Sequence, residues 1–470
     1  MENPYRREYY KNIPEEHIAE RYRNPRLKLP FDPKDLVMFL DRSAEGAPED
    51  LLRRLRTINY HHRSADLDIT TPIHENYPSR GGKPGVHHVY TQIDIKGSGF
   101  VYPEEHESKK HGLEAGGLAG SPEAVFAPES METPMGYDFL GLLDAGMVQN
   151  TVERARQLGG LGMRTECVAG IYDIEVINVN GREINFAEFK EEALRILRAQ
   201  IAELNPGEDD EQIGVLEDKI ASLSGEEGYQ PVIEVRCMRS VLRLRDLKDA
   251  PQEAVIGLVR EAVRSLNIEM QYLGSDRRFN AETPEGRKEW MEFVAYWIGR
   301  NVGIMHNQGL VHLFLHMGNL TLAGEVVDLD SVEPVLRRGR GEGRDCKDQP
   351  FYERMEDGYV CVNVGTEDFR RKDERYGLPI CLVKDLRDAC FSLRMTLKNL
   401  PALKREMSLH DISKKIIEGY AEGLANSKVY EDVGITAERL KEVMRDIAQR
   451  VIERNESFPS FQKTFILDKT

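Results

Sequence analysis

The balance of hydrophobic periodicities changes near residue 250, and this change constrains the fold more than any other feature of the sequence. Before it, alternating runs such as VHHVYTQIDIKGSGFVY (86–102) and QPVIEVRCMRSVLRLRDL (230–247) predict β-strands. After it, longer segments carry apolar residues at helical spacing, as in TPEGRKEWMEFVAYWIGRNVGIMHNQG (283–309). We therefore predict an α+β protein whose first part contains a sheet and whose second part is mostly helical.

The sequence divides into three regions. Residues 1–85 are polar, rich in arginine and contain prolines, so we expect an N-terminal extension that packs on the core. Residues 86–247 should form a sheet-containing lobe, and its stretch 165–184 holds an Asn-Gly pair, the strongest short hairpin signal. Residues 248–470 should form a helical lobe that ends in C-terminal helices. Its later helices are expected near 384–398, 408–426 and 436–455.

The composition is that of a soluble globular protein and excludes several classes of function. The net charge of −16 argues against a general nucleic-acid-binding surface, which requires a cationic face. The first residues contain no apolar stretch of a secretory signal, and no run approaches the roughly 18 apolar residues of a membrane span. The 6 cysteines are scattered without a CxxC pair, which favours reduced thiols. We therefore expect a cytoplasmic protein that binds neither nucleic acid nor membrane.

A lysine and a glycine-rich turn end the first predicted strand. Lys96 closes the alternating run and is followed by Gly97, Ser98 and Gly99. By itself, the Gly-Ser-Gly segment fits a plain turn as well as a phosphate-binding loop. A carboxylate at Glu132 precedes the next predicted helix and could pair with the lysine.

Two arginines and two oxygen ligands follow along the chain. Arg236 and Arg243 lie in the run 230–247, and arginine binds phosphate oxygens bidentately. Asn319 and Asp328 flank a hairpin-like apolar stretch and offer the hard oxygen ligands that Mg²⁺ takes beside nucleotide phosphates. Each residue also has a structural explanation, as a surface charge, a turn cap or a salt bridge. The order lysine, glutamate, arginines, asparagine and aspartate favours a phosphoryl-transfer site.

These motifs resemble those of the selenoprotein O family, the kinase-fold proteins that transfer AMP to other proteins. IDIKGSG resembles the family's lysine segment, and AVFAPESME resembles the start of its glutamate-bearing helix, so the resemblance implies that Lys96 pairs with Glu132. VRCMRSVLRLRDL matches an Arg-x3-Ser-x2-Arg pattern of the family, and HLFLHMGN followed by Asp matches its catalytic loop and metal aspartate. The likeness spans about 86–335. It implies a bilobal protein-kinase-like fold with a β-containing N-lobe and a helical C-lobe.

The resemblance also implies a function. The protein would be an ATP-dependent nucleotidyltransferase that moves AMP to a hydroxyl group of a protein acceptor, with ATP and Mg²⁺ (or Mn²⁺) as cofactors. The nucleotide-binding residues would be Lys96, Gly97, Ser98, Gly99, Arg236 and Arg243. The metal ligands would be Asn319 and Asp328.

This chain departs from the family at two carboxylates. Gly318 stands where the family has an aspartate just before the metal asparagine, and Phe314 stands where an ordinary kinase has its catalytic aspartate. Asp330 could act as a substitute base or as a second metal ligand. Because the segment that follows Glu132 is long, Glu153 is a second candidate for the partner of the lysine.

Two alternative functions remain open. Without either usual base, the chain could be a pseudokinase scaffold that binds nucleotide or nothing. It could also be a small-molecule phosphotransferase, although Phe314 counts against transfer of the γ-phosphoryl group. Transfer of label from α-labelled or γ-labelled ATP distinguishes these functions.

The spacing of the arginines makes a geometric prediction. Residues seven apart in a straight strand lie on opposite faces, so Arg236 and Arg243 could not reach one ligand from an uninterrupted strand. We therefore predict a bend between Met238 and Val241, after which Arg243 folds back toward Lys96.

Overall fold

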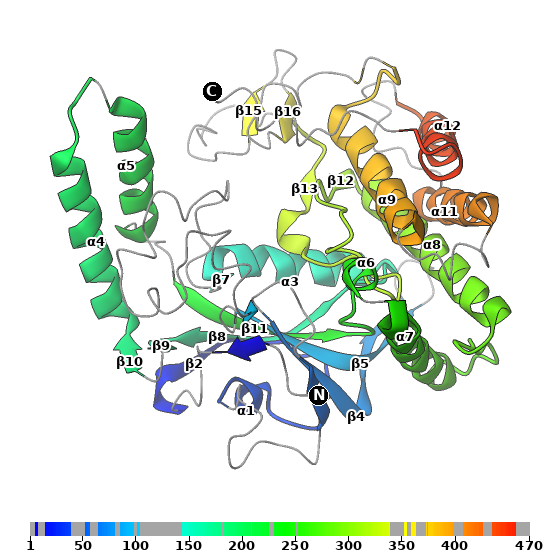
Figure 1. Cartoon of the computed structure of the whole chain (residues 1–470), viewed down its shortest axis with the longest axis horizontal. Coiled ribbons are helices and arrows are strands. Elements are labelled where there is room, and N and C mark those ends of the chain that lie inside the picture. The colour runs from blue at the N-terminus through cyan, green and yellow to red at the C-terminus, as the bar shows by residue number, and fades with distance from the viewer. Residues whose placement is uncertain are drawn as a thin grey trace. The chain divides into compact units, whose positions relative to one another are not determined.

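The computed structural model of the chain describes its architecture over several ranges (Figure 1). The described residues are 5–7, 15–38, 52–56, 64–79, 85–97, 101–103, 143–179, 182–207, 209–224, 230–250, 252–338, 352–354, 359–362, 373, 375–398, 408–425 and 435–456.

Two compact units make up the chain. The first unit combines residues 1–78, 87–153 and 167–241. The second unit combines residues 79–86, 154–166 and 242–470. The first contains a large sheet and the second is mostly helical, so the protein is α+β, as the change in periodicity predicts.

The first unit is built on a curled sheet that has seven strands among the described residues. The strand order is β2-β8-β11-β5-β4-β3, and β7 also pairs with β11. These strands are β2 (Ile18–Arg23), β3 (Leu52–Arg56), β4 (Ser64–Tyr77), β5 (Val86–Lys96), β7 (Leu143–Asp144), β8 (Cys167–Ile174) and β11 (Pro231–Met238). The described part of residues 1–78 is therefore built into the sheet through β2, β3 and β4.

Short strand pairs complete the β-structure. They are β1 (Tyr5–Arg7) with β6 (Val101–Pro103), β9 (Val176–Val179) with β10 (Arg182–Asn185), and β12 (Leu310–Val311) with β13 (Glu333–Pro334). A further three-stranded sheet contains β14 (Leu336–Arg338), β15 (Tyr352–Arg354) and β16 (Tyr359–Val362). Val179 pairs with Arg182, which leaves two residues between β9 and β10, so the hairpin predicted from the Asn-Gly pair is confirmed.

Most helices follow the segments with helical spacing, but residues 244–249 form a short helix after the bend at Arg239, where the alternating run 230–247 predicts a strand. The first unit contains α1 (Pro33–Met38), the start of α3 (Ala145–Gly159), α4 (Phe186–Glu203) and α5 (Asp210–Ser224). The second contains α6 (Leu244–Asp249), α7 (Gln252–Tyr272), α8 (Pro284–Asn307), α9 (Ile380–Lys398), α11 (Leu409–Leu424) and α12 (Ala437–Ala448). Short helical turns lie at Glu15–His17 in the first unit and at Leu329–Ser331 and Gln449–Glu453 in the second. Within the described ranges, none of these helices combines the length and the apolar character that crossing a membrane requires.

Strand β11 is buried along its whole length because the sheet is covered at this strand. Val232 packs with Val168 and Ile171 of β8 against Leu143 and Val148, which lie at and just after the short strand β7. A strand buried on both faces is expected to be apolar throughout. The charged side chains that interrupt β11 are therefore unusual, and they are described with the candidate site.

Helices α8 and α11 cross in close contact in the second unit (Figure 1). Glycines face the partner backbone at the crossing. A Cβ added at Gly299 would overlap the carbonyl oxygen of Ile416, and one added at Gly419 would overlap that of Tyr296. Any larger residue at these positions must therefore push the two helices apart.

Gly419→Ala should destabilise the second unit by about 1–3 kcal/mol, because overpacking a tight contact forces the backbone to shift. Gly257→Ala is the matched control, since Gly257 is exposed in α7 and nothing lies within 4 Å of the added Cβ. This control should stabilise the protein by about 0.5–1 kcal/mol, the helix-propensity gain of alanine over glycine. Urea unfolding followed by tryptophan fluorescence measures both, since both tryptophans lie in α8. Equal effects of the two substitutions would contradict the close crossing.

Candidate functional site

Asn319 and Asp328 flank the open end of a small hairpin. Leu320 and Val326 form an antiparallel bridge, and the N–H of Val327 donates to the carbonyl oxygen of Asn319 at 3.1 Å. Val327 thus lies opposite Asn319 in the hairpin, and Asp328 is the next residue. This explains the spacing of nine positions, because the chain returns on itself between the two residues.

The turn of the hairpin is closed by buried polar contacts. The N–H of Thr321 donates to the carbonyl oxygen of Glu325 at 3.0 Å, and the Thr321 hydroxyl donates to the Glu325 carboxylate at 3.1 Å. Gly324 takes the left-handed conformation, with φ of 75°, that the tight turn requires. Both Thr321 and Glu325 are fully buried, so this turn is part of the core.

Segments from two other parts of the second unit hold the hairpin on its two sides. The N–H of Leu244 donates to the carbonyl oxygen of Leu320 at 2.8 Å. On the other side, the N–H of Val326 donates to the carbonyl oxygen of Arg164 at 3.1 Å. The position of the hairpin is therefore set by backbone hydrogen bonds.

The loop before the hairpin is anchored by a buried carboxylate from α9. Asp385 accepts hydrogen bonds from the backbone N–H groups of His312 and Leu313, each at 2.7 Å. Leu313 is held with φ of 70°, which is uncommon for a residue with a side chain. Lys384 donates to the carbonyl oxygen of Leu313. Charge-assisted hydrogen bonds of this kind are stronger than neutral ones and make the loop rigid.

The oxygens of Asn319 and Asp328 have the chemistry of a magnesium site. The Asn319 side-chain amide donates through Nδ2 to the carbonyl oxygen of Phe314 at 3.0 Å, which orients Oδ1 away from that loop. Asp328 takes the left-handed conformation, with φ of 62° and ψ of 54°. An amide oxygen and a carboxylate, completed by phosphate oxygens and water, suit the octahedral shell of Mg²⁺. The two residues therefore fit the ion that the resemblance implies.

His316 lies beside this pair as a neutral ring. The residue is exposed as a whole, yet its Nδ1 accepts a hydrogen bond from the backbone N–H of Gly318 at 3.1 Å. Loss of hydration lowers the pKa of His316 to about 4, and the nearby Asp328 carboxylate opposes this shift. Since Nδ1 accepts this hydrogen bond, it carries no proton.

His312 and Asp330 have structural contacts near the hairpin. The ring of His312 is fully buried, with Nε2 at 2.8 Å from the carbonyl oxygen of Val327 and Nδ1 at 3.1 Å from the Ser331 hydroxyl. These contacts give His312 a structural role. Asp330 is partly exposed, and its Oδ1 accepts from the N–H of Ser331 at 3.1 Å.

Two carboxylates of this site have no signal in the sequence. Asp385 lies within α9, and Glu166 lies 163 residues before Leu329, whose N–H donates to its Oε1 at 3.1 Å. Both are buried and accept hydrogen bonds from backbone N–H groups. No local pattern distinguishes such a residue from a surface carboxylate.

In the first unit, Lys96 and Arg236 lie on neighbouring strands of the sheet. Lys96 is the last residue of β5 and stands directly opposite Glu234 of β11. Arg236 stands opposite Asp94 and forms a buried ion pair with it. The four side chains share one face, because residues two apart on a strand point to the same side.

The predicted bend between the arginines is confirmed. β11 ends at Met238, and the chain bends at Arg239. Arg243 then precedes α6, where its N–H donates to the Asp246 carboxylate at 2.6 Å. Arg236 belongs to the first unit and Arg243 to the second, so their convergence on one ligand stays a prediction.

The other predicted residues are divided between the units or lie outside the described residues. Ser98, Gly99 and Glu132 lie outside them. Glu153 is exposed on α3. Within the described ranges, the second unit brings Asn319 and Asp328 together, and the first brings Lys96 beside Arg236.

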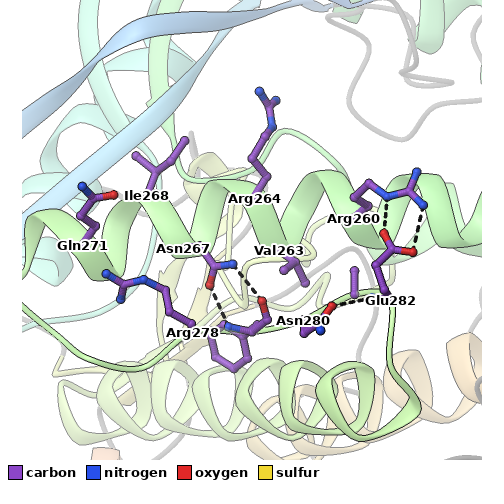
Figure 2. Close-up of a pocket in the computed structure, with 11 residues that line it drawn as sticks. Arg260, Val263, Arg264, Asn267, Ile268, Gln271, Arg278, Asn280 and Glu282 are labelled. Atoms are coloured by element: carbon purple, nitrogen blue, oxygen red, sulfur yellow. Dashed lines mark hydrogen bonds and ion pairs between the residues drawn. The ribbon is translucent and has the colours of Figure 1, made fainter.

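A pocket elsewhere in the second unit contains none of the predicted residues (Figure 2). It lies between α7 and the loop that leads to α8. The side chain of Asn267 closes part of it through two hydrogen bonds with the backbone of Phe279, at 2.8 and 2.9 Å. At its other end Arg260 pairs with Glu282.

Comparisons with known proteins bring no assignment. No protein-family model matches the chain, and no curated protein matches it. Among the described residues, no group of three or more histidine, cysteine, aspartate or glutamate side chains could hold a metal ion. The resemblance to the selenoprotein O family therefore depends on the sequence motifs alone, and the expected metal site depends on Asn319 and Asp328.

Proposed function

We propose that this protein is an ATP-dependent nucleotidyltransferase that moves AMP to a hydroxyl group of a protein. The observation that supports this most is the hairpin that pairs Asn319 with the residue before Asp328. The hairpin holds an amide oxygen and a carboxylate at one end, and these are hard ligands of the kind that Mg²⁺ takes. The loop anchored by Asp385 adds the rigidity that a transfer site needs.

The residues have distinct roles in this reaction. Asn319 and Asp328 would hold Mg²⁺, which when bound neutralises phosphate oxygens. Lys96 and the arginines would bind the remaining phosphate charge. The acceptor hydroxyl oxygen forms a bond to the α-phosphorus, and the bond from the α-phosphorus to the oxygen that bridges to the β-phosphate breaks. Pyrophosphate leaves, and the hydroxyl proton passes to Asp330 or to water.

The missing carboxylates are compatible with this chemistry. Phe314 and Gly318 occupy the positions of the usual bases. Phosphoryl-type transfer has a loose transition state, so catalysis depends mainly on positioning and charge neutralisation. A strong general base is therefore not required.

A nucleotide-binding scaffold is the second candidate function. It is favoured by Phe314, which stands at the sequence position of the catalytic carboxylate of a kinase. Phe314 is 36 % exposed. A phenyl ring there can contact a partner but cannot accept a proton. A small-molecule phosphotransferase is the third candidate, and the same ring counts against it.

Thermal unfolding with ATP, with and without Mg²⁺, tests these proposals. We expect ATP to raise the midpoint of unfolding, and Mg²⁺ to increase the shift. Label from α-labelled ATP should then appear on a protein acceptor. Transfer from γ-labelled ATP alone would favour the phosphotransferase, a shift without transfer would favour the scaffold, and no shift at all would contradict nucleotide binding.

A further inference from the structure

Four charged side chains lie together inside the sheet of the first unit. Asp94 and Lys96 belong to β5, and Glu234 and Arg236 belong to β11. Their exposed fractions are 0 % for Asp94, 8 % for Lys96, 0 % for Glu234 and 1 % for Arg236. Burying a charge is costly unless an opposite charge lies beside it. The arrangement of the four charges therefore needs an explanation.

The strand register pairs each charge with its opposite. In an antiparallel pair, directly opposite side chains share a face, with Cβ atoms about 4.5–5.5 Å apart. Arg236 stands opposite Asp94, and Glu234 stands opposite Lys96. The first of these pairs forms an ion pair. For the second pair, the register brings the Cβ atoms of Glu234 and Lys96 into the same range, with the carboxylate on β11 and the ammonium group on β5.

Gly97 allows the two strands to stay close at this end of the pair. It has φ of 86°, and a Cβ built on it would lie 2.6 Å from the carbonyl oxygen of Val232. Glycine therefore lets the chain leave β5 while its backbone still lies against β11. Lys96, the residue before it, is the last residue of β5 that pairs with β11.

We propose that Glu234 is the positioning residue of Lys96. Glu234 keeps the ammonium group of Lys96 charged and in one orientation, so that its remaining hydrogens can meet an anionic oxygen of the nucleotide. Asp94 positions Arg236 in the same way. This inference rests on the proposed function for the identity of the ligand, but the pairing itself does not. Glu153, the other described candidate, is exposed on α3.

The pKa of Lys96 measures the pairing without any nucleotide. It is followed by NMR of protein labelled at lysine Cε, and the Lys96 signal is the one lost in Lys96→Arg. Glu234→Gln should lower this pKa by at least about 1 unit, because a carboxylate within about 4–6 Å favours the charged lysine whereas burial favours the neutral one. Glu153→Gln should leave it unchanged. Glu175→Gln is the control for loss of a charge, since Glu175 is exposed in the same unit.

An unchanged pKa in Glu234→Gln, or an equal decrease in Glu153→Gln, would overturn the inference. If Glu234→Gln does not fold, two further variants decide. Glu234→Asp keeps the charge and should keep most of the Lys96 pKa. The double variant Lys96→Met with Glu234→Gln removes both charges, so it should fold better than Glu234→Gln alone. A double variant no more stable than the single one would contradict the pairing.

ATP binding separates this inference from the proposed function. The wild-type protein should bind Mg²⁺-ATP, and Glu234→Asp should weaken binding about tenfold, because the shorter side chain misplaces Lys96. If the wild type binds no ATP, the proposed function fails, and NMR still decides the pairing. If the wild type binds ATP and Glu234→Asp binds it equally well, Glu234 does not position Lys96 for the nucleotide.

Discussion

Glu269→Gln should lower the free energy of unfolding by about 3–5 kcal/mol, because it leaves a buried arginine without its counter-charge. Arg164 and Glu269 form a bidentate ion pair, with Nη1–Oε1 at 2.9 Å and Nη2–Oε2 at 2.6 Å. Their side chains are 4 % and 1 % exposed, so water cannot replace the lost partner. The guanidinium also stacks over Trp297, 4.9 Å from the ring centroid. The Arg164 carbonyl bonds the hairpin at Val326, so this pair also stabilises the candidate site.

Glu282→Gln is the matched control. Glu282 pairs with Arg260 in a similar two-bond geometry, at 2.6 and 3.2 Å, but both side chains are well exposed (Figure 2). Solvent screens such a pair, so its loss should not measurably change stability. Urea unfolding followed by tryptophan fluorescence reports on both variants, since Trp290 and Trp297 lie in the same unit as the two pairs. Equal losses would show that burial does not determine the strength of the Arg164 pair.

Asp328→Asn should remove the Mg²⁺-dependent part of ATP binding while the fold is retained. Asparagine is the suitable replacement because Asp328 has φ of 62°, a conformation that asparagine tolerates and alanine does not. The Mg²⁺-dependent gain in ATP affinity should fall by at least about 100-fold, since even residues that only support metal ligands contribute 10–100-fold. Isothermal titration with ATP, with and without Mg²⁺, measures this gain.

Asp330→Asn provides the comparison for this result. Asp330 lies two residues away, is also partly exposed, and already accepts a hydrogen bond from Ser331. If it is not a metal ligand, its replacement should leave the Mg²⁺-dependent gain intact. If Asp328→Asn keeps the full gain, the metal assignment is wrong. Losing the gain only in Asp330→Asn would transfer the assignment to that residue.

Local patterns predicted the parts of the fold that depend on neighbouring residues. The helical segment after residue 283 begins with a Thr-Pro pair, and α8 begins there, with the Thr283 hydroxyl accepting from the N–H of Gly286 at 3.1 Å. The bend after Met238 followed from the spacing of Arg236 and Arg243. Side-chain alternation and capping act over a few residues, which is why the sequence contains these signals.

The proposed partner of Lys96 could not be predicted in this way. The motifs indicate Glu132 and Glu153, which lie nearer to the lysine in the sequence than Glu234 does. Glu234 lies much later, in the run that contains Arg236 and Arg243. Only the register of β5 with β11 places Glu234 opposite Lys96. Register between strands distant in sequence depends on the whole sheet, so no local pattern contains it.

The sequence by itself determined the α+β class, the long helices of the second unit and the return of the chain between Asn319 and Asp328. These features follow from periodicity, turn residues and side-chain alternation, which are properties of short segments. Tertiary structure alone decided which carboxylates hold the site. Asp385 binds a loop 73 residues before it, and Glu269 pairs with an arginine 105 residues away. Such contacts form only when the core brings distant segments together, because the energy of a buried charge depends on what surrounds it in space.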